Sequence, residues 1–278
     1  MYAGSVVIDF LPQSAERYRS SHAIVAIDVI RATTTLCTAA AAGRRCYAAP
    51  SVDAALARAA RLEAPLVVGE VGGNMPFGFD LTNSPAAMAA RSDIERPMVL
   101  VSSSGTQLIH NARGCEALYI ACFRNWRAVA RHLAGRHRSV AVLGAGTRGE
   151  FREEDQICCA WIAALLLDAG YRAANRATRE VIARWKDAPA AACTVSNSVA
   201  YLIRSAQLKD LHFVLSHVDD LDAVFAFDDD EAVRIPRAPF ARWNPAPTGA
   251  VSPPSTARPA AAPSSSASCV PSDAASSW

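Results

Sequence analysis

The chain has 278 residues, of which 51% are hydrophobic and 19% are charged, so it can bury a substantial core. The formal net charge is +2, and the basic residues are scattered along the chain, which does not favour a nucleic-acid-binding protein. The longest apolar run, residues 157–167, is too short to span a bilayer. We therefore expect neither a nucleic-acid partner nor a membrane segment.

Apolar runs typical of strands alternate with alanine-rich segments typical of helices along most of the chain. Strands are expected at residues 6–10, 23–27, 45–48, 65–68, 98–101, 117–122 and 139–143. Helices are expected at residues 31–42, 51–62, 86–90, 107–112, 125–134, 156–169, 175–185 and 190–207, before a strand-rich part at 212–235. This alternation predicts an α/β fold, a three-layer α/β/α arrangement with a largely parallel, mixed sheet, and the last strands are expected to be antiparallel strands at its edges.

The composition changes at about Pro245. The remaining residues are mostly Pro, Ala, Ser and Thr, and only Arg258 and Asp273 are charged. Such a segment buries too little apolar surface to offset the entropy lost on ordering. We therefore expect one α/β domain over residues 1–244 and a disordered tail over 245–278.

The eight cysteines indicate a reducing compartment. Most of them lie in apolar segments, and no two have the C-x-x-C spacing of a metal or redox site. The chain does not open with a basic segment followed by an apolar run, as a secretory signal peptide does. We expect a cytoplasmic protein with reduced, buried cysteines.

Four polar loops follow expected strands, at residues 28–35, 69–85, 102–106 and 144–155. Each loop alone is compatible with an ordinary turn or helix cap. In a parallel sheet, however, the loops after the carboxyl ends of the strands share one edge, where ligands bind. We therefore expect the acidic side chains of these loops to meet at one rim. They are Asp28, Glu70, Asp80, Glu150, Glu153, Glu154 and Asp155.

This set of side chains suits a divalent cation and a phosphorylated substrate. Mg²⁺ takes one or a few carboxylates and completes its coordination with water and phosphate oxygens. Arg31 and Arg148 can hold phosphate or sulfonate oxygens in a fixed fork, and N–H groups of glycine- and serine-rich loops can bind the same anion. The acids at 153–155 also suit the first turn of a helix, where the helix dipole favours negative charge.

Three other site types fit the sequence less well. Residues 144–149 match the dinucleotide-binding pattern G-x-G-x-x-G, but a charged run follows where an apolar helix should begin. Asp28-Val29-Ile30 lacks the second acid of a D-x-D phosphotransfer motif, and no G-x-S-x-G nucleophile elbow occurs.

The same four loops resemble those of the 2-phosphosulfolactate phosphatase family, the magnesium-dependent phosphatases of coenzyme M biosynthesis. The likeness runs in order from about residue 5 to 236 and implies hydrolysis of 2-phospho-3-sulfolactate to 3-sulfolactate and phosphate. The family usually has Arg where this chain has Val71, and Asn where it has Ser104, which leaves a shifted substrate open. The matching pieces are residues 27–35, Gly69-Glu70, 78–81, 83–85, 104–106, 144–146, Gly149, Glu154 and Asp155.

The main hypothesis is a magnesium-dependent phosphatase acting on a small acidic phosphoester; the alternative is a nucleotide- or phosphometabolite-binding protein without turnover. The sequence leaves open whether water or a carboxylate attacks phosphorus, and whether the chain forms a homo-oligomer. The candidate catalytic residues are Asp28, Arg31, Asp80 and Asp155, and the candidate metal ligands are Asp28, Glu70 and Asp155. The candidate substrate-binding residues are Thr33, Asn83, Ser84, Ser104, Gly105, Thr106, Gly144 and Gly146.

Overall fold

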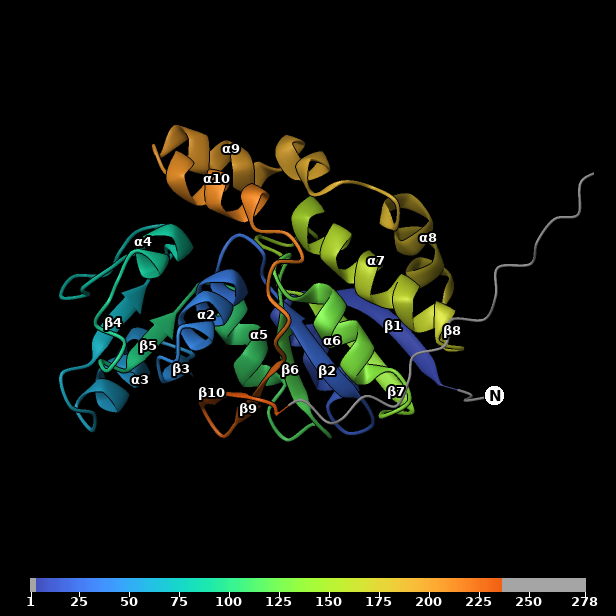
Figure 1. Ribbon diagram of the computed structural model, residues 1–278, viewed down its shortest axis with the longest axis horizontal. Coiled ribbons are helices and arrows are strands. Elements are labelled where there is room, and N and C mark those ends of the chain that lie inside the picture. Colours follow the sequence, from blue (N-terminus) through green and yellow to red (C-terminus); the bar gives the residue numbers. More distant parts are fainter. Residues whose placement is uncertain (1–3, 237–278) are drawn as a thin grey trace, which may run out of the picture. The chain divides into compact units, whose positions relative to one another are not determined.

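The computed structural model describes residues 4–236, and these form an α/β fold on one mixed sheet of ten strands (Figure 1). The predicted tail, residues 245–278, lies outside the described residues. Across the sheet the strand order is β4-β5-β3-β10-β9-β6-β2-β7-β1-β8. The strands are β1 (Ser5–Phe10), β2 (Ala23–Ile27), β3 (Cys46–Ala49), β4 (Leu66–Gly69), β5 (Met98–Val101), β6 (Leu118–Ala121), β7 (Ser139–Gly144), β8 (Arg172–Ala173), β9 (Phe225–Asp228) and β10 (Glu231–Arg234).

The sheet consists of two parallel groups joined by an antiparallel hairpin. β6, β2, β7, β1 and β8 pair in parallel, and so do β4, β5 and β3. The β9–β10 hairpin lies between the groups, because Ala226 of β9 pairs with Tyr119 of β6 and Glu231 of β10 pairs with Tyr47 of β3. The predicted antiparallel direction of the last strands is confirmed. Their predicted place at the edge is wrong, because both sides of the hairpin find a partner strand.

Helices cover both faces of the sheet, which confirms the three-layer arrangement. Alternate residues of each strand point to opposite faces. Val25 of β2 packs in a cluster with Ile157 of α7, whereas Ile24 packs in another cluster with Leu36 of α2 and Leu108 of α5. The helices are α1 (Ala15–Tyr18), α2 (Ala32–Ala41), α3 (Val52–Ala59), α4 (Pro85–Ala89), α5 (Gly105–Asn111), α6 (Trp126–Leu133), α7 (Glu153–Asp168), α8 (Arg176–Trp185), α9 (Asn197–Arg204) and α10 (Leu208–Ser216), with 3-10 turns at Pro12–Ser14 and Ala190–Val195.

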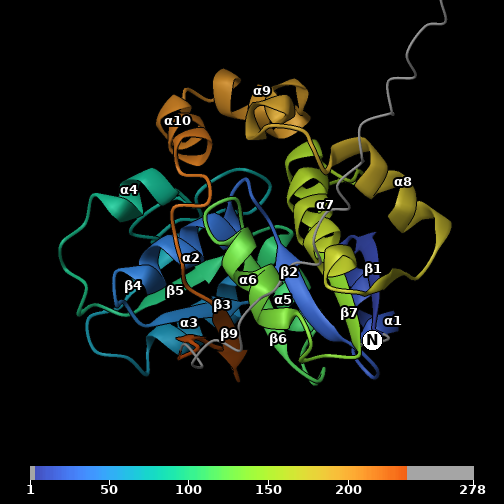
Figure 2. The same ribbon diagram turned by 45° about the vertical axis from the view of Figure 1, so that its right-hand side comes forward.

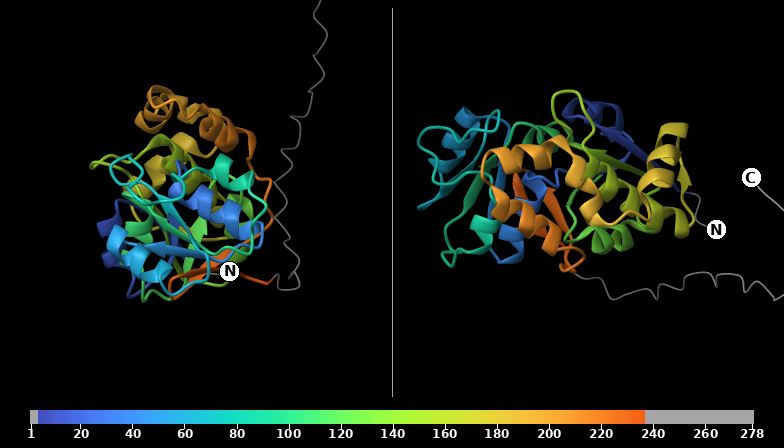
Figure 3. Two further views of the ribbon diagram at one scale, coloured as in Figure 1. Left: turned by 90° about the vertical axis from the view of Figure 1, so that its left-hand side faces the viewer. Right: turned by 90° about the horizontal axis from the view of Figure 1, so that it is seen from above.

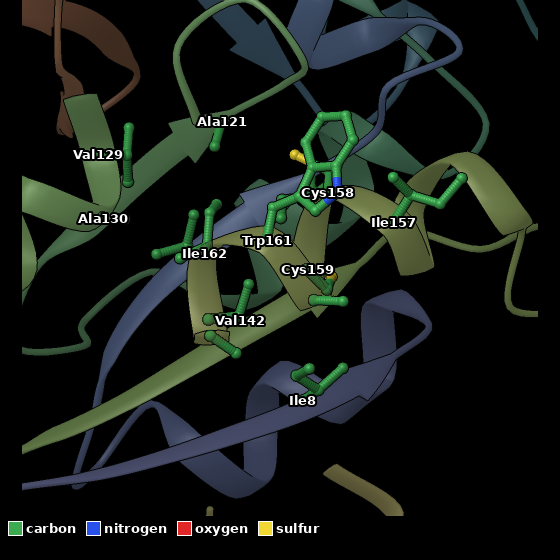
Figure 4. Packing of buried hydrophobic residues seen from close by; sticks show 14 of the residues in the cluster. Ile8, Ala121, Val129, Ala130, Val142, Ile157, Cys158, Cys159, Trp161 and Ile162 are labelled. Atoms are coloured by element: carbon green, nitrogen blue, oxygen red, sulfur yellow. The ribbon is translucent and has the colours of Figure 1, made fainter. Parts of the chain in front are cut away.

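The helix α7 supplies much of the core on its face of the sheet. Cys159 and Ile162 are fully buried and lie against Val142 of β7, with Ile8 of β1 nearby (Figure 4). The seven cysteines within residues 4–236 are all free thiols, and six of them are buried. They pack as small hydrophobic side chains, as expected.

The helices α9 and α10 lie together, and α10 also contacts α4 (Figures 1 and 2). Both views of Figure 3 show the same grouping. A strand-rich part was predicted from residue 212, but residues 208–216 are helical. Short apolar runs fit either structure, and here Asp210 and Val214, one helical turn apart, are the buried residues. Within residues 4–236, none of the helices combines the length and apolar character needed to cross a membrane.

Candidate active site

The loops after β2, β4, β5 and β7 line one cavity of about 590 Å³, together with residues of α9. The four loops that the sequence singled out therefore meet, as predicted. Five of the predicted site residues line the cavity directly: Asp28, Arg31, Glu70, Asn83 and Ser104.

Asp28 follows β2 and is fixed through its main chain. Its N–H group donates a hydrogen bond of 2.9 Å to Oγ1 of Thr33, and this hydroxyl donates to the carbonyl oxygen of Ala121 at 2.7 Å. Thr33 is fully buried. It was predicted to bind substrate, but its hydroxyl is used to hold the backbone of Asp28 in place.

The Asp28 carboxyl group is hard to ionise in the folded chain. Burial is the main cause that raises its pKa, to about 7, and the charges of Glu70 and Glu154 add to it, while a hydrogen bond from the Ala32 N–H group and the charge of Arg31 oppose the shift. A Cβ atom at Gly105 would lie 2.3 Å from Oδ2 of Asp28. Glycine at this position therefore lets the start of α5 approach the carboxylate.

Asp155, in the first turn of α7, links the loop after β2 with the loop after β7 through hydrogen bonds. Its Oδ1 accepts a hydrogen bond from the Val29 N–H group (2.9 Å), and its Oδ2 accepts one from Gly146 (3.3 Å). Burial, followed by the charges of Asp28 and Glu154, raises the pKa of Asp155 well above its usual value. Asp155 is not among the cavity-lining residues, and its hydrogen bonds hold the loops after β2 and β7 in place.

The residues Gly144–Gly146 were predicted to offer N–H groups to an anion. The structure uses these groups internally, because Ala145 donates to the carbonyl oxygen of Ile27 (2.7 Å) and Gly146 donates to Asp155. Gly144 serves packing, since a Cβ atom there would lie 2.4 Å from the ring of Phe151. The predicted anion cradle at these glycines is not formed.

Glu70 connects the loop after β4 with the loop after β5. Its Oε1 accepts a hydrogen bond from the Ser103 N–H group (2.7 Å), and its Oε2 accepts from the Gly73 N–H group (2.7 Å) and the Ser103 hydroxyl (2.9 Å). Carboxylate oxygens have further lone pairs, so Glu70 can still face the cavity as an acceptor.

Arg31 forms a buried ion pair that the sequence did not reveal. Its Nη1 donates to Oδ2 of Asp210 in α10 at 2.6 Å and also to the Gln207 side chain, and both charged side chains are only 4% exposed. Asp210 also accepts hydrogen bonds from the hydroxyl of Ser84 (2.5 Å) and the N–H group of Ala86 (3.2 Å). Ser84, predicted to bind substrate, thus caps α4 and contacts Asp210 instead of lining the cavity.

Two further predicted residues lie away from the cavity lining. Asp80 accepts a hydrogen bond from the Val67 N–H group (2.8 Å) beside β4, and Thr106 is buried and exchanges hydrogen bonds with Ser102. Neither lines the cavity. The Asp80 carboxylate thus stabilises the turn that brings the chain back along β4.

The cavity also contains residues that the sequence analysis did not select. Arg152 and Arg204 join Arg31 and Arg148 in the lining, so four arginines line one cavity. Two buried polar atoms there have no hydrogen-bond partner within residues 4–236, namely Nε of Arg152 and Oδ1 of Asn83. Buried polar atoms are normally paired, so these atoms are suited to contact a ligand. Arg152 could have been noticed as the only base in the acidic run 150–155, whereas α9 gives no comparable signal.

The carboxylates that line the cavity could supply a magnesium ion with only part of its coordination shell. Within residues 4–236, no three His, Cys, Asp or Glu side chains converge as metal ligands. Mg²⁺ needs only one or two carboxylates when water and phosphate oxygens complete its shell. Asp28 and Glu70 both line the cavity and can serve in this way, whereas Asp155 does not line it.

Comparison with known proteins places the chain in a family. The family model of 2-phosphosulpholactate phosphatase matches residues 9–230. A probable 2-phosphosulfolactate phosphatase of Pseudothermotoga lettingae is 37% identical over 149 residues, which cover 54% of this chain and 63% of that protein. A probable 2-phosphosulfolactate phosphatase of Synechococcus sp. (strain CC9605) is 33% identical over 171 residues, covering 59% of this chain and 70% of that protein.

A probable 2-phosphosulfolactate phosphatase of Prochlorococcus marinus (strain MIT 9313) is 32% identical over 191 residues, covering 65% of this chain and 77% of that protein. The chain thus spans slightly less than two thirds of the Pseudothermotoga protein and more than two thirds of the other two. Because the family model matches most of the chain and the loops that carry the resemblance enclose the cavity, this protein belongs to the 2-phosphosulfolactate phosphatase family.

Proposed function

We propose that this protein is a magnesium-dependent phosphatase that hydrolyses 2-phospho-3-sulfolactate to 3-sulfolactate and phosphate. The observation that supports this most strongly is the cavity itself, which is lined by four arginines and by a buried aspartate whose pKa is about 7. The substrate named for the relatives carries a phosphate, a sulfonate and a carboxylate group. Guanidinium groups bind such oxygens in pairs, so the charge of the cavity complements that of the substrate.

Val71, which stands where the family usually has arginine, does not remove the positive charge of the cavity. Val71 is half exposed and does not line the cavity, although Gly72 and Gly73 do. An arginine is absent at this position, but Arg31, Arg148, Arg152 and Arg204 remain in the lining. We therefore retain the family substrate as the proposed one, together with the role in coenzyme M biosynthesis that the resemblance implies.

Asp28 and Glu70 would hold the magnesium ion, which when bound neutralises charge on the phosphoryl group. The ionised Asp28 can accept the proton of an attacking water molecule, or its own oxygen can attack phosphorus. Quenching the reaction during turnover distinguishes the two routes, because only the second accumulates an acyl phosphate on Asp28. In either case the ion pair with Asp210 fixes the position of Arg31, which would donate hydrogen bonds to the anionic oxygens of the substrate.

The affinity for Mg²⁺ should depend on pH. Protons compete with the metal for Asp28, whose pKa is about 7 in the metal-free chain, so binding weakens as the pH falls through this value. Between pH 8 and pH 6, calorimetric titration should show a loss of affinity of about tenfold, since the ionised fraction falls by that factor. An affinity that stays constant over this range would contradict the assignment of Asp28 as a ligand.

A further inference from the structure

Arg152 is a buried arginine with an unused donor in the cavity. It precedes α7 and lines the cavity, its side chain is only 10% exposed, and its Nη1 donates to the Glu150 carboxylate. Its Nε has no partner within residues 4–236. A buried guanidinium donor without an acceptor costs free energy, and a bound anion would remove this cost.

The Glu150 carboxylate shows what this position accepts. Besides Arg152, its Oε2 accepts a hydrogen bond of 3.0 Å from Nδ2 of Asn197, the first residue of α9. Two donors from separate elements thus already hold an oxygen of one acid group. The Glu150 side chain is 57% exposed, so it can move into water at little cost when a ligand arrives.

The charges of the cavity are divided between two sides of the chain. The loops after β2 and β4 supply Asp28, Arg31 and Glu70, whereas the segments around α7 and α9 supply Arg148, Glu150, Arg152 and Arg204. Neither Arg148 nor Arg204 forms an ion pair within the described part of the chain. With three arginines and one glutamate, the α7–α9 side of the lining therefore has an excess of positive charge, whereas the other side, with two acids and one arginine, does not.

We propose that Arg152 and Asn197 form a second anion subsite, which binds the acid group of the substrate that is not hydrolysed, and that Glu150 occupies this subsite in the free protein. The inference rests on the proposed function and assigns its substrate specificity. Nε and Nη2 of Arg152, which share one edge of the guanidinium group, can pair with two oxygens of a sulfonate, and Asn197 can donate to the third once Glu150 has left. The substrate class is thus a phosphoester that carries a second strong acid group.

The subsite can be tested by binding without hydrolysis. Calorimetric titration with 3-sulfolactate, which has no phosphate, should show at least tenfold weaker binding for Arg152→Gln than for the wild type. Glu150→Gln should bind 3-sulfolactate several-fold more tightly, because the internal competitor has lost its charge. This gain distinguishes a displaced anion from a structural ion pair, whose loss would leave binding unchanged or weaker, and that result would overturn the proposal.

A matched control is Arg44→Gln, since Arg44 is also a buried, ion-paired arginine, but it pairs with Asp93 outside the cavity lining. Its binding of 3-sulfolactate should equal that of the wild type. A loss like that of Arg152→Gln would show a general effect of removing a buried arginine and overturn the subsite.

Hydrolysis separates this inference from the proposed function. We expect Arg152→Gln to lower kcat/KM at least tenfold more for 2-phospho-3-sulfolactate than for isopropyl phosphate, which lacks the second acid group. Equal losses for both substrates would overturn the subsite but leave the phosphatase intact. If no phosphate is released while binding of 3-sulfolactate still depends on Arg152, the subsite stands and the proposed activity fails.

Discussion

Replacing Asp28 by asparagine should lower kcat by about 10²–10⁴-fold while the protein stays folded. Asparagine has the same shape and can still accept the hydrogen bond from the Ala32 N–H group, but it can neither take up a proton from water nor attack phosphorus. The bonds between Thr33 and Asp28 involve the main chain of Asp28, so the substitution leaves them in place. Phosphate release under saturating substrate measures the effect.

Stability measurements show whether the Asp28 variant remains intact. Because burial raises the pKa of Asp28, its contribution to the free energy of unfolding is greatest at low pH and is lost as the pH rises towards and through about 7. In the absence of metal, the free energy of unfolding of Asp28→Asn relative to that of the wild type should therefore increase as the pH rises from 5 to 8. Asp93→Asn, which changes a carboxylate outside the cavity lining, serves as the activity control. Wild-type turnover in Asp28→Asn would remove this residue from the reaction.

Replacing Asp210 by asparagine should destabilise the fold by about 3–5 kcal/mol. Arg31 is almost fully buried and would lose the carboxylate that compensates its charge, whereas Ser84 and Ala86 could still donate to the asparagine oxygen. A domain of this size should lose about 2–4 °C in Tm for each kcal/mol. Urea unfolding, followed by circular dichroism, measures the free energy directly.

Two controls identify the cause of this destabilisation. Asp219 pairs with Arg127 at the surface, and Asp219→Asn should cost less than about 1 kcal/mol. The double variant Arg31→Met, Asp210→Asn should recover part of the loss, because it no longer buries an unpaired charge. Equal costs for Asp210→Asn and Asp219→Asn would contradict the importance of the buried pair.

The local parts of the fold could be predicted from the sequence. The strand expected at residues 23–27 is confirmed as Ala23–Ile27, in which every residue is buried. The helix expected at residues 51–62 is confirmed as Val52–Ala59, which Ser51 caps by accepting a hydrogen bond from the Ala54 N–H group. The position of β9 and β10 could not be predicted, because insertion between two parallel groups depends on pairing with Tyr47 and Tyr119, far away in the sequence.

For the candidate site, the sequence likewise predicted which loops meet, but not the contacts within and between them. Asp28 and Glu70 follow strands and therefore reach the shared rim, as expected. Thr33 and Asp155 were recognised as polar residues of the right loops. The sequence does not reveal that Thr33 binds the main chain of Asp28 in its own loop, or that Asp155 binds the main chain of Val29 in another loop. Asp210 lies about 180 residues from Arg31, and no local pattern links two such partners.

Phosphate release from 2-phospho-3-sulfolactate, measured with Mg²⁺ and with excess EDTA, decides whether this protein is a metal-dependent phosphatase. We expect rapid release with Mg²⁺, loss of activity in EDTA and recovery when Mg²⁺ is returned in excess. Binding of the phosphoester without any release would contradict a phosphatase and favour a binding protein. Release that persists undiminished in EDTA would contradict the role of the metal held by Asp28 and Glu70.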